Sequence, residues 1–301
     1  MGDNTGINWT DATWNPVTGC AKVSAGCKHC YAERDWSRLS ANPKTVYFGR
    51  QFTDVAVHPE RLDQPLRWNR PRKIFVNSMS DLFHPDVPED FILKVFRVMA
   101  QTQQHQFQVL TKRPERMREV LSRWKADGVA LLEVHGSVLP NVWLGVTVED
   151  QASADLRVPL LLDTPAALRF LSMEPLLENV DISFALGWAR TRNGNWVAGR
   201  GIDWVIVGGE SGPKARPMDP LNALIVQDRC AKAGVPFVFK QWGAWVPEME
   251  ILRDHPERFE KMVKLDKEYM RSGVWMYRVP GAWDNALLDG VAHIAEPFWN
   301  D

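Results

Sequence analysis

Short apolar runs rich in β-branched and aromatic residues alternate with segments of helical periodicity along most of this 301-residue chain. Such runs are typical of strands buried on both faces, as in parallel sheets. Their alternation with helices predicts βαβ units, and we expect an α/β fold, a partial (β/α) barrel of about six parallel strands. The predicted strands begin at Lys73, Phe107, Val142, Leu168, Trp204 and Val235, and helices are predicted over residues 89–103, 114–125 and 220–233.

The composition excludes several classes of protein. With 45% hydrophobic and 24% charged residues, the chain is neither disordered nor fibrous. No apolar run approaches the roughly 18 residues that a membrane span needs. The first residues lack the basic and apolar regions of a secretory signal, so a cytoplasmic location is expected. The net charge of −1 gives no overall attraction to nucleic acid, so such a partner would need a local basic patch.

Polar and ionisable residues follow the predicted strands directly. In a (β/α) barrel the carboxyl ends of the strands form the functional face, so these residues are predicted to share one site. Lone charges at a solvated rim are the alternative for each of them. The candidates are Ser78, Ser80, Asp81, Lys112, Arg113, Thr147, Glu149, Glu174, Glu210, Arg216, Lys240, Gln241 and Trp242.

The chemistry of these side chains suggests roles for some of them. The cations suit an anionic substrate or a phosphate; they are Lys112, Arg113, Arg216 and Lys240. Gln241 and Trp242 combine an amide with a stacking surface, which would hold a base or nucleotide. Glu174, in a Met-Glu-Pro run after an apolar strand, is predicted to act in catalysis together with Lys240.

Three of the four cysteines form a Cys-x6-Cys-x2-Cys arrangement at Cys20, Cys27 and Cys30. Such a cluster in a chain without a disulfide framework points to metal or redox chemistry. Three thiolates suit a [4Fe–4S] cluster that leaves one iron without a protein ligand. A structural zinc site would need a fourth ligand, either His29 or the distant Cys230. The absence of any metal is the third alternative.

Several motifs together resemble a family of phage and bacterial proteins with a three-cysteine motif, which is itself similar to radical S-adenosylmethionine (SAM) enzymes. The resemblance implies a TIM-like partial barrel with a [4Fe–4S] cluster in the loop after the first strand, and SAM as second cofactor. One departure is the first cysteine spacing, since most radical SAM enzymes have three residues there. The motifs are residues 7–16, 20–33, 78–84, 110–114, 172–175, 208–217 and 239–243.

The resemblance also implies cofactor-binding roles according to the order of the strands. The amino-acid part of SAM is assigned to Ser78, Ser80 and Asp81, and the ribose region to Thr147 and Glu149. Glu210 ends a Gly-Gly-Glu run that resembles the motif contacting the SAM ammonium group, although a tight turn explains the run equally well.

A distant similarity to spore photoproduct lyase, a radical SAM enzyme of DNA repair, implies a further role for Cys230. A thiol at this position would donate a hydrogen atom. Cys230 lies in a predicted helix, where lone cysteines are usually small buried hydrophobes.

Together with the cysteine cluster, the resemblance implies a radical SAM-type enzyme that generates a 5′-deoxyadenosyl radical and depends on an electron donor. Its expected substrate is a nucleic acid or nucleotide-like molecule, in modification or repair of DNA. The alternative is a zinc- or cluster-stabilised binding protein without SAM chemistry, working with a partner protein in a phage or antiphage assembly. Residues 1–243 are expected to form the barrel, and residues 244–301 a C-terminal cap or subdomain.

Overall fold

The computed structural model describes residues 7, 9–129, 138–190, 196–198, 201–254, 256–262, 264, 266–279 and 287–297. The chain divides into two compact units. The first comprises Met1–Thr147 with Arg157–Phe170, and the second comprises Val148–Leu156 with Leu171–Asp301. Each unit buries large apolar side chains of its own, such as Phe107 in the first and Phe239 in the second.

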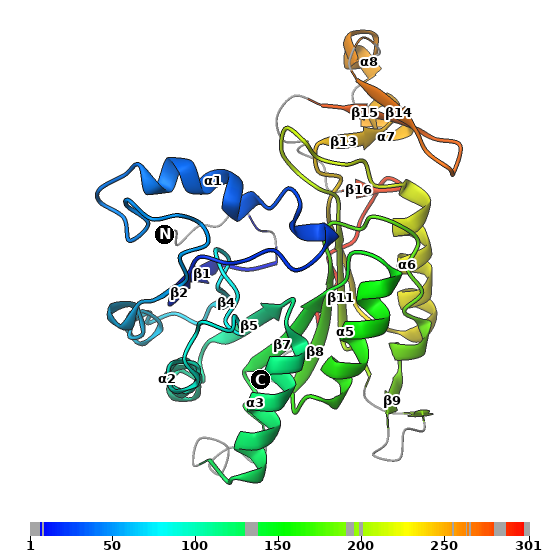
Figure 1. Cartoon of the computed structure of the whole chain (residues 1–301). Coiled ribbons are helices and arrows are strands. Elements are labelled where there is room, and N and C mark those ends of the chain that lie inside the picture. Colours follow the sequence, from blue (N-terminus) through cyan, green and yellow to red (C-terminus); the bar gives the residue numbers. More distant parts are fainter. Residues whose placement is uncertain are drawn as a thin grey trace. The chain divides into compact units, whose positions relative to one another are not determined.

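The predicted alternation of parallel strands and helices is confirmed, and the fold class is an α/β partial barrel (Figure 1). A seven-stranded sheet has the order β1-β4-β5-β7-β8-β11-β12. The strand missing from the sequence prediction is β1, because three residues are too short a run to stand out. The strands are β1 (Ala12–Trp14), β4 (Lys73–Val76), β5 (Gln106–Thr111), β7 (Val142–Thr147), β8 (Leu168–Met173), β11 (Trp204–Gly208) and β12 (Phe237–Gln241).

The helices follow these strands much as the periodicity predicts. Pro114 begins a helix at the position where its missing N–H costs nothing. In the described parts of the chain, no helix is both long and apolar enough to cross a bilayer. The helices are α1 (Tyr31–Ser40), α2 (Glu89–Gln101), α3 (Pro114–Ala126), α5 (Gln151–Asp163), α6 (Pro220–Ala233), α7 (Glu248–Asp254) and α8 (Pro256–Met262).

In the first unit, β1, β4, β5 and β7 pair in parallel, and their register lines up apolar residues across the strands. Ala12 pairs with Ile74, Ile74 with Phe107, and Phe107 with Val142, and all four are buried. Partners in a parallel pair lie on the same face of a sheet, so this row forms part of one continuous core.

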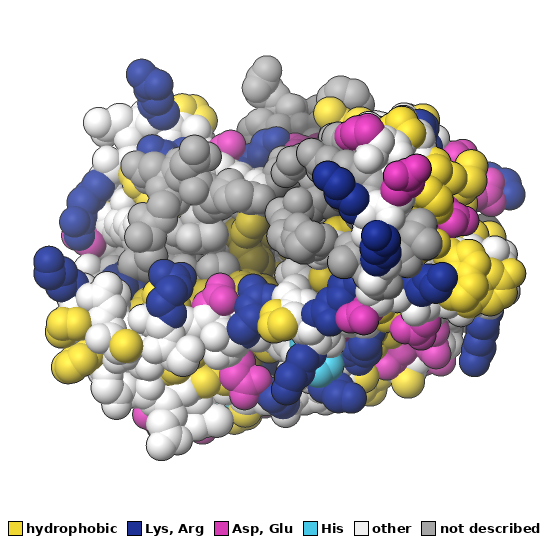
Figure 2. Space-filling view, turned by 90° about the horizontal axis from the view of Figure 1, so that it is seen from above, with side chains coloured by type: hydrophobic (Ala, Val, Ile, Leu, Met, Phe, Trp, Pro, Cys, Tyr) yellow, Lys and Arg dark blue, Asp and Glu magenta, His cyan; other side chains and the backbone are white. Residues whose placement is uncertain are grey.

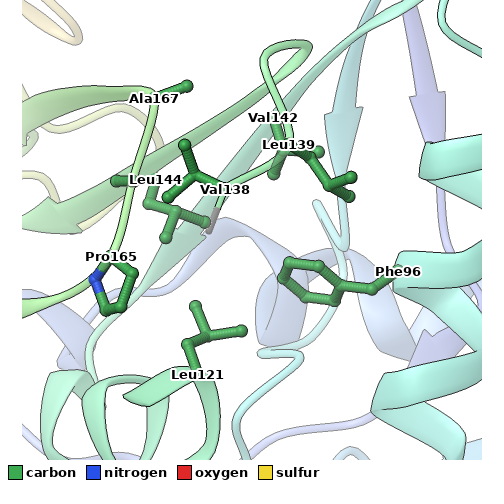
Figure 3. Close-up of a pocket in the computed structure, with 9 residues that line it drawn as sticks. Phe96, Leu121, Val138, Leu139, Val142, Leu144, Pro165 and Ala167 are labelled. Atoms are coloured by element: carbon green, nitrogen blue, oxygen red, sulfur yellow. The ribbon is translucent and has the colours of Figure 1, made fainter. Parts of the chain in front are cut away.

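A small cavity in the first unit lies between α2, α3 and β7 (Figure 3). Phe96, Leu121 and Leu144 point into it, and its volume is about 20 Å³. A space of this size holds at most about one water molecule, and its apolar lining offers water few partners. We therefore regard it as a packing gap and place no ligand there.

In the second unit, β11 and β12 pair in parallel, and α6 packs against both strands (Figure 1). The limits predicted for this helix are confirmed, and local capping explains them. The Asp219 side chain accepts a hydrogen bond from Leu221 N at the N-terminus. Gly234 ends the helix in the left-handed conformation, with φ of 67°.

Beyond the large sheet, β15 (Trp275–Arg278) lies between β13 (Trp245–Pro247) and β14 (Lys267–Tyr269) in an antiparallel sheet. The helix α7 contacts β13 and β15 of this sheet, and α8 contacts α7 (Figure 1). The domain boundary between residues 243 and 244 stays a prediction. The remaining short strands pair as β2 (Val17–Thr18) with β3 (Ala56–Val57), β9 (Trp188–Arg190) with β10 (Trp196–Ala198), and β16 (Leu287–Leu288) with β17 (Val291–Ala292).

Candidate functional site

The cysteine loop, residues 19–30, begins where β2 ends and finishes at the start of α1. Gly19 has a φ of 86°, and a Cβ here would lie 2.5 Å from Asp54 O, so only glycine fits this approach. Cys20 N donates to Phe52 O at 2.9 Å, which fixes the start of the loop. Cys27 ends a short 3-10 helix, and Cys30 is the N-cap residue of α1.

The three thiols of the cysteine loop are free and partly exposed. Burial and the Asp81 carboxylate raise the pKa of Cys20, and the Arg113 guanidinium lowers it through its charge and its hydrogen bond, so that the net shift is upward. The Ser24 hydroxyl lies 3.8 Å from Cys27 Sγ.

The chemistry of three free thiols suits a zinc ion or an iron–sulfur cluster, because both take thiolate ligands. Among the described residues, however, no three Cys, His, Asp or Glu side chains converge closely enough to hold a metal ion. The three thiols are therefore suitable metal ligands in their chemistry, but the described residues do not bring them together into a metal site.

Asp81, Arg113 and the partly exposed Cys20 form a chain of contacts. Arg113 Nη1 donates to Asp81 Oδ2 at 2.9 Å and to Cys20 Sγ at 3.6 Å. Arg113 Nη2 donates to Ala21 O at 2.9 Å. The Asp81 and Arg113 side chains are only 7% and 11% exposed, so this is a largely desolvated ion pair.

Both carboxylate oxygens of Asp81 accept hydrogen bonds from the protein itself. Its Oδ1 accepts from Thr111 Oγ1 at 2.7 Å and from Phe83 N at 3.0 Å, and its Oδ2 accepts from Lys112 N at 3.1 Å as well as from Arg113. A direct contact of Asp81 with SAM, as the resemblance implies, would have to displace one of these donors. That role stays a prediction.

Ser78 and Ser80 connect the end of β4 to the loop that follows β1. Ser78 Oγ donates to Asn15 Oδ1 at 3.2 Å, and Ser80 Oγ donates to Val17 O at 2.8 Å. The Tyr31 hydroxyl donates to Ser78 O. Both serine hydroxyls therefore donate to protein groups here, and their predicted contact with SAM stays untested.

Asn15 and Asn77 also connect these two segments by hydrogen bonds, and they were not among the site residues predicted from the sequence. Asn15 Oδ1 also accepts from Met79 N at 3.1 Å. Asn77 has a φ of 60°, a conformation that asparagine tolerates better than most residues, and its Oδ1 accepts from Val17 N at 3.2 Å. The available signal was the position of Asn77 directly after a buried strand.

Thr147 is the last residue of β7, Glu149 follows two residues later, and both are buried. The Thr147 carbonyl accepts from Arg157 Nη1 at 2.7 Å in the first unit. In the second unit, Glu149 O accepts from Leu177 N at 2.9 Å, and Glu149 N bonds to Ser153 Oγ at 2.9 Å. Their assignment to a ribose stays a prediction.

Glu174 and Lys240 form an ion pair in the second unit, at the ends of β8 and β12. Glu174 Oε1 lies 3.0 Å from Lys240 Nζ, and Ser172 Oγ donates to Glu174 Oε2 at 3.2 Å. A Cβ at Gly208 would lie 2.6 Å from Glu174 Oε1, so the glycine at the end of β11 gives this carboxylate its room. The structure thus brings together the two residues predicted to act in catalysis.

Glu210 and Arg216 are also paired with each other. Arg216 Nη2 donates to Glu210 Oε1 at 2.7 Å, and both Arg216 Nε and Arg216 N donate to Glu210 Oε2, at 2.9 and 2.8 Å. This bidentate pair closes the loop after β11. A Cβ at Gly209 would lie 1.9 Å from Trp242 O, which supports the structural explanation of the Gly-Gly-Glu run.

The predicted stacking role of Trp242 does not match its position. The ring is 2% exposed, packs edge-on against Phe239, and donates from Nε1 to Leu287 O at 2.8 Å. Both the ring and its N–H are therefore engaged inside the protein. Gln241 is partly exposed, and its side chain lies 3.5 Å from Gly209 O.

Cys230 is fully buried in α6, and burial raises its pKa to about 12. The thiol is therefore protonated and has no access to solvent in the described structure. This environment corresponds to the small buried hydrophobe considered as the alternative.

The predicted cationic site is largely neutralised. Arg113, Arg216 and Lys240 are each paired with a carboxylate, namely Asp81, Glu210 and Glu174. On the face shown in Figure 2, Lys and Arg side chains are interspersed with Asp and Glu side chains. Anion binding by these cations would have to compete with the carboxylates.

Comparisons with known proteins add the following findings. A family model described as "Protein of unknown function (DUF5131)" matches residues 4–296. No protein among those with curated descriptions matches the chain.

Solved structures of spore photoproduct lyase match at low similarity. One mutant is 11% identical with a TM-score of 0.40, over 93% of this chain and 73% of that chain. Another, with bound AdoMet and dinucleoside spore photoproduct, is 10% identical with a TM-score of 0.40, over 88% of this chain and 67% of that chain. A complex with dinucleoside spore photoproduct is 10% identical with a TM-score of 0.38, over 89% and 67%.

Proposed function

For this chain, which belongs to the DUF5131 family of proteins of unknown function, we propose an iron–sulfur enzyme of the radical SAM type. The observation that carries the proposal is the cysteine loop. It presents Cys20, Cys27 and Cys30 as free, partly exposed thiols directly after the first two strands. Its first thiol also receives a hydrogen bond from a buried arginine.

The three thiolates would hold a [4Fe–4S] cluster and leave one iron for SAM. A cluster held there would supply one electron, received from an electron donor, for the reductive cleavage of SAM to methionine and a 5′-deoxyadenosyl radical. The chain's own part is to hold the loop. Gly19 allows the close approach to Asp54, and Ser80 binds the backbone of Val17.

The ion pair in the second unit provides a proton donor and acceptor for a substrate. Lys240 can give a proton and Glu174 can take one, and the two groups are 23% and 15% exposed. Their limited exposure limits the access of water. We assign this pair to substrate protonation steps within the proposed reaction.

We infer a nucleic acid or nucleotide-like substrate, in modification or repair of DNA. Lys112, partly exposed directly after β5, is the residue of the first unit proposed to contact it. Binding through phosphates requires an affinity that falls with salt. Failure to bind oligonucleotides at low salt would remove this half of the proposal.

The direct test is anaerobic reconstitution followed by reaction with SAM and a strong reductant, with 5′-deoxyadenosine as the measured product. The wild type and Cys230→Ser should form it, and Cys27→Ser should not. Cys230→Ser is the matched control, because it removes a buried thiol of α6 that is not part of the cysteine loop. Equal product from all three proteins, or none from a cluster-loaded wild type, would refute radical SAM chemistry.

One observation favours a second candidate, a metal-stabilised binding protein without SAM chemistry. Ser78, Ser80 and Asp81, the groups assigned to SAM, all bond to the protein itself. In this candidate the cysteine loop binds zinc or a cluster for stability and contributes to a surface for a partner protein. Metal binding without measurable SAM binding in equilibrium dialysis would favour it.

A further inference from the structure

Arg113 reaches the cysteine loop from the residue that precedes α3. Its two terminal nitrogens address different parts of the loop, since Nη1 lies 3.6 Å from Cys20 Sγ and Nη2 lies 2.9 Å from Ala21 O. One planar group therefore contacts both a thiol and the adjacent backbone. An arginine guanidinium suits such a double contact, because its donors have a fixed geometry.

The guanidinium is itself held in place. Asp81 Oδ2 accepts from Arg113 Nη1 at 2.9 Å, and Asp81 is fixed by Thr111 Oγ1 at 2.7 Å and by Phe83 N at 3.0 Å. Arg113 N further donates to Thr111 Oγ1 at 2.9 Å. The ends of β4 and β5 thus determine where the guanidinium lies.

Two thiols of the loop, Cys20 and Cys27, differ in their neighbours. Cys20 faces a buried cation, whereas Cys27 has the neutral Ser24 hydroxyl at 3.8 Å. A hydrogen bond from a cation to a thiolate ligand stabilises added negative charge on the group that the thiolate binds. Such hydrogen bonds to sulfur are among the factors that set the potential of iron–sulfur clusters.

We propose that Arg113 is a positioning residue that fixes Cys20 and the backbone of Ala21 at the start of the cysteine loop and raises the reduction potential of the group bound by the loop. The positioning half stands on the contacts alone. The redox half rests on the proposed function, because it requires a bound iron–sulfur cluster.

The test compares Arg113→Gln, Arg113→Lys and the control Arg116→Gln. Arg116 lies in α3 and donates to His84 O and Val87 O, which precede α2, but it does not contact a thiol in the described structure. Arg113→Gln removes the charge. Arg113→Lys keeps the charge and removes the contact with Ala21 O. It also replaces Arg113→Gln as the test variant if the Gln variant does not fold.

The metal-free measurement is hydrogen exchange over residues 18–23. We expect exchange at least about tenfold faster in both Arg113 variants, corresponding to the loss of one charge-assisted hydrogen bond, and no change in Arg116→Gln. Unchanged exchange in the Arg113 variants overturns the positioning half. This arm is decisive even if the wild type binds no iron, which would refute the proposed function alone.

The loaded-protein measurement is the midpoint potential of the reconstituted cluster. Arg113→Gln should lower it by about 59 mV, a tenfold change in a one-electron equilibrium. Arg113→Lys should recover part of this shift, whereas a merely structural role would not respond to the restored charge. An unchanged potential in Arg113→Gln overturns the redox half.

Discussion

Asp81→Ala should be among the most destabilising single substitutions in the first unit. The carboxylate is 7% exposed, and it accepts from Arg113, Thr111 and two backbone N–H groups. Removing one partner of a buried ion pair leaves the other charge desolvated, which costs about 3–5 kcal/mol. Asp90→Ala is the control, because its pair with Lys94 is exposed, and its loss should cost less than about 1 kcal/mol.

The assay is urea unfolding, with hydrogen exchange of the β4 and β5 amides to report on the first unit. Arg113→Ala and the double variant complete a double-mutant cycle with Asp81→Ala. The double variant should lose clearly less than the sum of the two single losses, because no buried charge is then left alone. A loss below about 1 kcal/mol for Asp81→Ala, or strictly additive losses, would refute this reasoning.

Three further predictions concern other parts of the molecule. Burial lowers the pKa of His58, His84 and His105, so the unfolded chain binds more protons than the folded one. The contribution of these histidines to the free energy of unfolding should therefore be greatest above a pH of about 6.5 and decrease as the pH falls below that value. Urea midpoints that do not change between pH 7.5 and 5.5 would contradict this. In the metal-free native protein, iodoacetamide should modify the partly exposed loop thiols and leave Cys230 intact, because burial raises the pKa of Cys230 to about 12; mass spectrometry of peptides decides, and rapid modification of Cys230 would show that α6 opens. Gly209→Ala should disrupt the pairing of β11 with β12, because its Cβ would lie 1.9 Å from Trp242 O; wild-type thermal stability in this variant would be inconsistent with the backbone contact.

Sequence patterns predicted six of the seven strands of the large sheet and the helices α2, α3 and α6, because the signals involved are local. The limits of α6 follow from Asp219 and Gly234, which act on the nearest backbone groups. β1 escaped detection because three residues carry little pattern, although they pair directly with β4.

Site residues were easier to select than to interpret. The position after a strand identified Asp81, Arg113, Glu174 and Lys240, but not that they form two ion pairs. Each pair joins residues from different strands, so the partner of a charge depends on the tertiary fold. The environment of Trp242 likewise depends on Leu287, which is distant in the sequence.

The central claim, that the cysteine loop holds an iron–sulfur cluster, is tested most directly by iron and sulfide analysis after anaerobic reconstitution. The proteins are the wild type, Cys27→Ser and Cys230→Ser. We predict about four irons and four sulfides per chain in the wild type and in Cys230→Ser, and loss of both in Cys27→Ser. Zinc in place of iron, or equal iron in all three proteins, would contradict the claim.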